Sequence, residues 1–162
     1  MRTFANLAHS LLASLSSGYI LFYFSELVFW ARPRSEDSLA NWAATWLAYS
    51  IMAFLFLALV QDFHVRNLPA LFLCGAFFGW LAEGVIVQTA YENLPLSLSF
   101  TGLAWHALIT ILAGWYGLQM ALRSGLRRAM SASFFTGLFV WFWGICWIYE
   151  EPLTAAAPEL FA

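Results

Sequence analysis

Apolar residues dominate five long stretches of the chain, and short polar segments separate them. The stretches run over about residues 4–30, 39–60, 68–90, 96–122 and 131–149. Each is close to the ~20 residues that an α-helix needs to cross a bilayer. The pattern predicts an all-α polytopic membrane protein, a bundle of five transmembrane helices forming a single domain over residues 1–162, with an irregular tail at 150–162.

The composition supports a lipid environment. Hydrophobic residues make up 62% of the chain and charged residues only 10%, against roughly 25% charged residues in soluble domains. The chain has nine Trp residues, and Trp and Tyr are enriched at membrane interfaces. One face of the second stretch therefore predicts an interfacial anchor, made of Trp42, Trp46 and Tyr49. The chain has no Lys and no basic run, which excludes a nucleic-acid-binding surface.

The distribution of arginine predicts the orientation. Because five is an odd number of crossings, the two termini lie on opposite faces of the membrane. One face then has five Arg residues and the other has two. The first group is Arg2, Arg66, Arg123, Arg127 and Arg128, and the second is Arg32 and Arg34. Because Lys and Arg accumulate in cytoplasmic loops, we expect a cytoplasmic amino terminus and an external acidic carboxyl terminus, in a bacterial inner (plasma) membrane. The first apolar stretch continues well beyond a signal-peptide core, so we expect an uncleaved span.

Two stripes of small and polar residues indicate helix faces that pack against other helices. In the third stretch Gly75, Gly79 and Glu83 follow one another at intervals of four. In the fourth stretch the same interval recurs in Gly102, His106, Thr110 and Gly114. Small residues at such spacing let helix backbones approach closely, so the four glycines are predicted helix-packing residues.

Glu83 and His106 are predicted to meet. Counting 1.5 Å per residue, Glu83 lies about 12 Å and His106 about 15 Å below the outer surface. The short loop between the two stretches makes their helices antiparallel neighbours. Ionisable residues inside a span usually face a protein interior or a cavity. We therefore predict an outward-facing polar pocket between the third and fourth helices.

The pair suggests several chemistries. Glu83 and His106 are the candidate catalytic residues, acting by proton transfer, and they are also the candidate metal ligands, although two ligands are too few to indicate a metal. No cofactor is identified. The candidate ligand-binding residues around the pair are Glu26, Gln88, Tyr91, Asn93 and Thr110.

A purely structural role is the main alternative for the pair. An interhelical hydrogen bond that sets helix register contributes roughly 0.6 kcal/mol on average. Three functional hypotheses remain open. The first is a membrane protein that binds a small or lipophilic ligand (a lipid, isoprenoid or pigment), either with or without catalysis. The second is an accessory or assembly subunit of a larger membrane complex, with His106 ligating a pigment. The third is a small homo-oligomeric transporter or channel.

One segment resembles the membrane enzymes of carotenoid biosynthesis. Glu83, Thr89 and Tyr91 are followed by Leu103-Ala104-Trp105, and in those enzymes an intramembrane acidic helix is also followed by a loop and a Leu-Ala-Trp helix. The resemblance spans about one sixth of the chain, and the acidic residues expected elsewhere in such enzymes have no match in it. It implies an isoprenoid ligand.

Overall fold

The computed structural model describes residues 2–35 and 37–150, with side-chain surroundings for 7–35 and 37–146. Apart from Glu150, the predicted tail lies outside the described residues. Five helical rods are long and apolar enough to cross a membrane, as predicted. In chain order the helices are α1 (Arg2–Phe22), η1 (Tyr23–Leu27), α2 (Val28–Trp30), α3 (Leu39–Asp62), α4 (Leu68–Trp80), η2 (Leu81–Ile86), η3 (Thr89–Tyr91), η4 (Leu98–Gly117), α5 (Leu118–Arg123) and α6 (Leu126–Glu150).

Local chemistry explains where several helices begin. The Ser38 hydroxyl accepts a hydrogen bond from the Asn41 N–H at 3.1 Å and starts α3. The Asn67 side chain accepts from the Ala70 N–H at 2.8 Å at the start of α4. Each bond satisfies a backbone donor that has no partner within the first helical turn.

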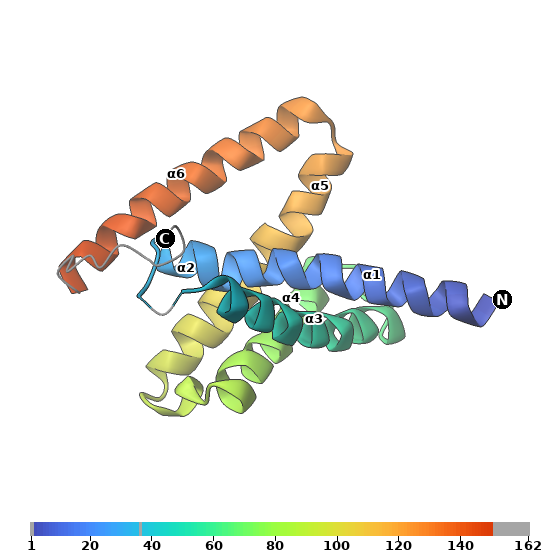
Figure 1. The fold of residues 1–162 in the computed structure, drawn as a ribbon, viewed down its shortest axis with the longest axis horizontal. Helices are drawn as coiled ribbons and strands as arrows, with labels where there is room; N and C mark the ends of the chain where they lie inside the picture. The colour runs from blue at the N-terminus through green and yellow to red at the C-terminus, as the bar shows by residue number, and fades with distance from the viewer. Residues whose placement is uncertain (1, 36, 151–162) are drawn as a thin grey trace.

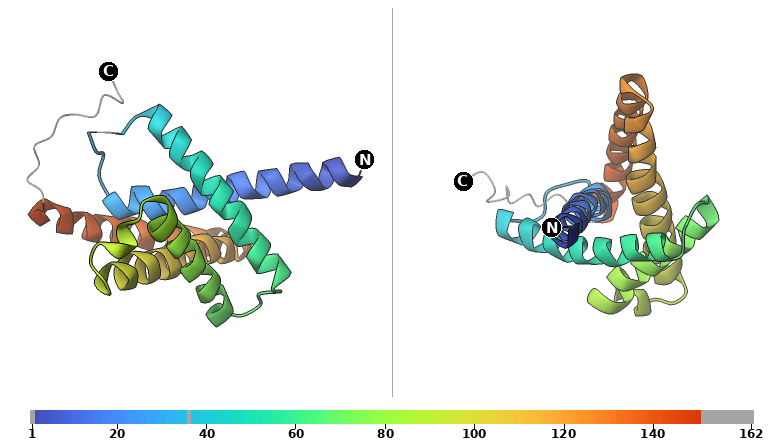
Figure 2. Two further views of the ribbon diagram at one scale, coloured as in Figure 1. Left: turned by 90° about the horizontal axis from the view of Figure 1, so that it is seen from below. Right: turned by 90° about the vertical axis from the view of Figure 1, so that its right-hand side faces the viewer.

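The helices form two crossing pairs around one apolar core. α1 packs against α3, and α4 packs against η4, as Figures 1 and 2 show. α1 begins at the right of Figure 1 and α6 ends at its left. The core contains Leu21, Phe56, Phe78 and Ile111, each 1% exposed or less.

α6 stands apart from this core. No residue in its most hydrophobic window is buried, and Figure 1 shows it leaving α5 at an angle. It returns to the other helices near its end, where the Trp143 indole N–H donates to the Phe29 carbonyl oxygen at 2.6 Å. The predicted five-helix bundle is therefore a four-rod core with the fifth rod attached at one end.

Two predicted boundaries were wrong. The third rod ends at Ile86 rather than at residue 90, because Gln88 adopts a left-handed conformation (φ 64°) and turns the chain back. The following segment then lies against η2, where the absence of a side chain at Gly84 leaves room for the Tyr91 hydroxyl. The fifth rod begins at Leu126 rather than at 131, since Gly125 (φ 103°) alone makes the tight turn.

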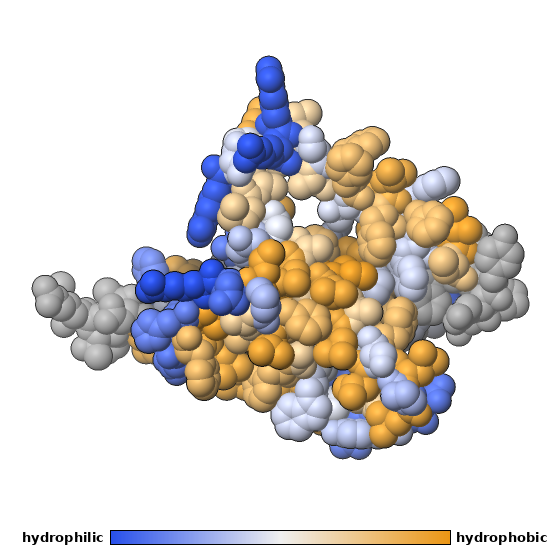
Figure 3. All heavy atoms as spheres, turned by 180° about the vertical axis from the view of Figure 1, so that it is seen from behind, coloured by the Kyte–Doolittle hydropathy of each residue, from blue (hydrophilic) through white to orange (hydrophobic). Residues whose placement is uncertain are grey.

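Hydrophobic side chains cover the middle of the molecule. Figure 3 shows them in orange, with hydrophilic side chains in blue gathered at the turn between α5 and α6. Many large apolar residues are exposed to the surroundings of the protein, including Phe54, Leu73, Phe134 and Trp141. Water would not tolerate so large an apolar surface, whereas hydrocarbon would.

Three segments have wide π-type turns: η1, η2 and η4. A π turn closes with an i→i+5 hydrogen bond, as the Val87 N–H does to the Ala82 carbonyl at 3.1 Å. In an ordinary α-helix with 3.6 residues per turn, residues spaced four apart shift gradually around the helix axis. In the wider η4 the predicted stripe Gly102, His106, Thr110 and Gly114 stays on one face, and all four residues are buried.

We expect Gly79→Ala to destabilise the fold by about 1–3 kcal/mol, the usual cost of overpacking a well-packed core. A Cβ at Gly79 would collide with the Gly102 carbonyl oxygen on η4. Gly137→Ala is the matched control, because a Cβ there meets nothing within 4 Å, and its stability should be unchanged or higher. Unfolding of the purified protein by sodium dodecyl sulphate, followed by tryptophan fluorescence, measures both. Equal effects of the two substitutions would contradict the close contact.

Candidate functional site

Glu83 and His106 meet between η2 and η4. His106 Nε2 lies 2.8 Å from Glu83 Oε1, so the contact expected between them is present. The side chain of His106 is 3% exposed and that of Glu83 is 15% exposed. Two glycines explain the contact: one turn before Glu83, a Cβ at Gly79 would collide with the Gly102 carbonyl oxygen, and two turns before it, a Cβ at Gly75 would lie 3.0 Å from the Ala107 Cα, which is tighter than ordinary contact.

Glu83 is close to the end of its helix. The rod ends at Ile86, so the carboxylate lies within the last turn, whereas the sequence predicted about two turns between Glu83 and the outer end of the helix. Thr89, beyond the turn at Gln88, donates its hydroxyl hydrogen to Glu83 Oε2. Both carboxylate oxygens therefore have partners, and the remaining exposure is at the loop end of the rod.

The other side of His106 is bonded to the first rod. His106 Nδ1 lies 3.1 Å from the Ser25 hydroxyl oxygen, which in turn lies 3.1 Å from the Thr110 hydroxyl oxygen. Ser25 is 4% exposed and Thr110 is 0% exposed. The polar cluster, defined here as Glu83, Thr89, His106, Ser25 and Thr110, thus joins three of the five rods.

The polar cluster can satisfy His106 in two protonation states. When the ring is neutral with hydrogen on Nε2, Nδ1 accepts from the Ser25 hydroxyl. When the ring is cationic, both nitrogens donate, and the Ser25 hydroxyl can turn its hydrogen to Thr110. The Ser25 hydroxyl can donate either to His106 Nδ1 or to Thr110. Both ring nitrogens of His106 therefore have a partner in each of these arrangements.

Aromatic rings shield the polar cluster. The Phe78 ring meets the His106 ring edge-on, with centroids 5.6 Å apart. Trp105, next to the histidine, is 2% exposed, and its indole N–H donates to the Phe24 carbonyl at 3.1 Å. Hydrogen bonds in such a low-dielectric setting are electrostatically stronger than in water.

A second acidic side chain lies beside the polar cluster. Glu26 follows Ser25 in the chain, and its Oε1 accepts a hydrogen bond from the Tyr49 hydroxyl at 2.8 Å. Tyr49 is 5% exposed, so it is a core residue and not the interfacial anchor that the sequence suggested. Ser25 and Glu26 lie in η1, Glu83 in η2 and His106 in η4. Such wide turns occur often at functional sites.

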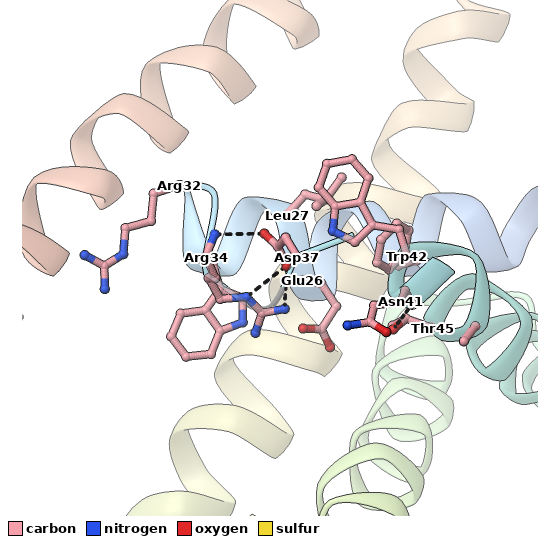
Figure 4. Close-up of a pocket in the computed structure, with 11 residues that line it drawn as sticks. Glu26, Leu27, Arg32, Arg34, Asp37, Asn41, Trp42 and Thr45 are labelled. Atoms are coloured by element: carbon pink, nitrogen blue, oxygen red, sulfur yellow. Dashed lines mark hydrogen bonds and ion pairs between the residues drawn. The ribbon is translucent and has the colours of Figure 1, made fainter. Parts of the chain in front are cut away.

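Glu26 also lines a cavity of about 270 Å³ at the loop end of α1 and α3, the outer cavity hereafter. Figure 4 shows Glu26 with Asn41 and Trp42 around it, and Arg34 paired with Asp37. The Trp42 indole nitrogen is buried and has no hydrogen-bond partner among the described residues. The outer cavity therefore has a carboxylate acceptor in its lining, together with the aromatic ring of Trp42 and the guanidinium groups of Arg32 and Arg34.

The structure gathers some of the predicted ligand-binding residues and leaves others apart. Thr110 belongs to the polar cluster, and Glu26 lines the outer cavity. Gln88 and Asn93 are exposed in the loop between η2 and η4. Tyr91 is 56% exposed, and its hydroxyl accepts from the Trp80 indole at 3.3 Å. The outer cavity lies between α1 and α3, not between the third and fourth rods.

Sequence reasoning missed Ser25 and Tyr49 as members of the site. For Ser25, a small residue in an apolar span is usual on a helix-packing face, so its type alone does not mark it. Its position next to Glu26 was the available signal, since two polar residues in succession near the end of a span are unusual. For Tyr49 the neighbouring tryptophans suggested an interface, and no sequence feature marked its burial.

A metal site has little support in the geometry. Among the side chains described, at residues 7–35 and 37–146, no group of three or more His, Cys, Asp or Glu is close enough to hold a metal ion. Glu83 and His106 would provide two ligands, and structural zinc sites use four.

Comparison of the chain with protein-family models, with curated proteins and with solved structures found no match.

We expect Ser25→Ala to lower the free energy of unfolding by about 1–2 kcal/mol, because it removes two interhelical hydrogen bonds. Ser133→Ala is the control: its hydroxyl is exposed and donates to Ala129 in its own helix at 3.0 Å, so its effect should stay within about 0.5 kcal/mol. Detergent-based unfolding measures both. A Ser25→Ala protein as stable as the Ser133→Ala protein would show that the bonds of Ser25 contribute nothing.

Proposed function

We propose that this is a multi-pass membrane protein that binds the polar end of a small or lipophilic ligand in the outer cavity. In this proposal Glu26 and Trp42 contact the ligand, and Glu83 with His106 forms an acid/base pair beside it. One observation supports the proposal above all: a carboxylate and an imidazole are hydrogen-bonded near the loop end of a candidate span. The Ser25 hydroxyl holds the other ring nitrogen of His106 in the same network.

The outer cavity fits a ligand with a polar head. Glu26 provides a hydrogen-bond acceptor and Arg32 a cationic donor in its lining, while Phe22, Leu27 and Trp30 add apolar surface. The resemblance of the Glu83–Trp105 segment to carotenoid-synthesising membrane enzymes favours an isoprenoid among the lipophilic candidates. If the protein is an enzyme, Glu83 would transfer the proton and His106 would hold the carboxylate in position.

We expect Glu83→Gln to lose a small-molecule adduct that gently purified wild-type protein carries in native mass spectrometry. The amide keeps the size of the carboxylate but cannot exchange its proton. Glu92→Gln is the matched control, since Glu92 is exposed in the adjoining loop. Glu26→Gln should lower the occupancy as well. An adduct retained by Glu83→Gln would contradict a role for the pair in ligand binding, and a bare wild-type mass would contradict tight binding.

The membrane orientation is part of the same proposal. We place the end that carries Arg66, Arg123, Arg127 and Arg128 in the cytoplasm of a bacterial cell, following the positive-inside rule. Ser124 and Asn93 lie in turns at opposite ends of the rods.

We expect a cysteine introduced at Asn93, and not one introduced at Ser124, to react with a membrane-impermeant maleimide on intact cells. Both variants would carry Cys74→Ala and Cys146→Ala, because these two native cysteines are free thiols. Lysed cells provide the control in which both sites should react. Labelling of Ser124→Cys alone on intact cells would reverse the orientation.

A role as a subunit of a larger membrane complex, or as a homo-oligomer, is the second candidate. The observation that favours it is α6, whose most hydrophobic window is unburied along its whole length. The same native mass spectrum tests this: a stoichiometric protein partner would support the assembly role, and a monomeric mass would contradict it.

A further inference from the structure

A second polar cavity lies at the end of the molecule opposite Glu83. It has a volume of about 380 Å³ and lies between the turn that joins α3 to α4 and the end of α5. Two arginines, Arg66 and Arg123, line it together with Asn67 and Gln119. We call it the basic cavity.

The basic cavity has a net positive lining. No acidic residue is among its lining residues, and the nearest acid in the sequence, Asp62, is exposed at the end of α3. Within the described ranges, neither Arg66 nor Arg123 has a hydrogen-bond or ion-pair partner. Two unpaired guanidinium groups that face one cavity are suited to an anion with several oxygen atoms, because each can donate two parallel hydrogen bonds.

The level of the cavity indicates where the anion comes from. Three candidate spans begin or end beside it, at Asp62, Leu68 and Arg123. The ends of membrane spans lie at the level of the lipid headgroups. The lining also has apolar side chains, including the buried Leu71 and the exposed Met120. Basic pockets between spans are known to hold lipid headgroups.

We propose that the basic cavity binds the phosphate of an anionic phospholipid, with Arg66 and Arg123 donating to the phosphate oxygens. The first part of the acyl chains lies along Leu71 and Met120. This site is separate from the outer cavity, and its existence does not depend on the function proposed above.

The test is native mass spectrometry of the full chain in detergent with added dioleoylphosphatidylglycerol, dioleoylphosphatidylcholine or inorganic phosphate. The wild type should take up one phosphatidylglycerol in preference to phosphatidylcholine. In Arg66→Gln/Arg123→Gln, the affinity for phosphatidylglycerol should fall about tenfold or more. Arg127→Gln/Arg128→Gln is the matched control: it removes the same charge from exposed positions at the same end, and its affinity should stay within about threefold. Circular dichroism checks that each variant is folded.

Several outcomes would overturn the proposal. An equal loss in both double variants would show that general surface charge, and not the cavity, attracts the lipid. Inorganic phosphate that competes as well as phosphatidylglycerol would identify a site for a soluble anion. If the double variant fails to fold, Arg66→Gln and Arg123→Gln are measured singly, and unchanged lipid affinity in both would contradict the proposal. Equal uptake of phosphatidylglycerol and phosphatidylcholine by the wild type would also contradict the proposal.

Discussion

The close approach of α4 to η4 is the constraint on which the polar cluster depends. At Gly75 and Gly79 the α4 backbone lies directly against η4, without room for a Cβ. One turn further on, this closeness places Glu83 against His106 at 2.8 Å. Larger residues at these glycines would separate the helices, and a carboxylate and an imidazole inside apolar rods would lose their shared hydrogen bond.

Buried polar groups are costly unless each has a partner, and the polar cluster meets this requirement by joining three rods. Ser25 in η1 bonds to His106 and Thr110 in η4, while Thr89 bonds to Glu83 from the loop. A network that is fully satisfied in the low dielectric of an apolar interior makes the helix arrangement specific. Because the Ser25 hydroxyl can reverse, the same network also tolerates a change of charge on His106.

The two ends of the molecule have different chemistry. The end near Glu83 has the outer cavity, with Glu26 and Asp37 in its lining beside Arg32 and Arg34. The other end has the basic cavity, with Arg66 and Arg123. A charge difference of this kind orients a protein in a bilayer, since basic residues are retained on the cytoplasmic side and attract anionic lipids there. In the proposed orientation the end with Glu26 and Glu83 faces the opposite side of the bilayer.

The sequence by itself determined the number of rods and the face on which Glu83 and His106 meet, because hydrophobic length and the four-residue stripes are local properties of the chain. It also located the main turns, with errors of four or five residues where Gln88 and Gly125 adopt positive φ angles that no hydrophobic pattern reveals. Only the tertiary structure decided that Ser25 and Tyr49 are buried partners of this site, that the cavity next to Glu26 lies between α1 and α3, and that α6 stands outside the core. These features depend on contacts between residues far apart in the chain, such as Ser25 and Thr110, and on helix crossing angles, which a single sequence does not encode in any local signal.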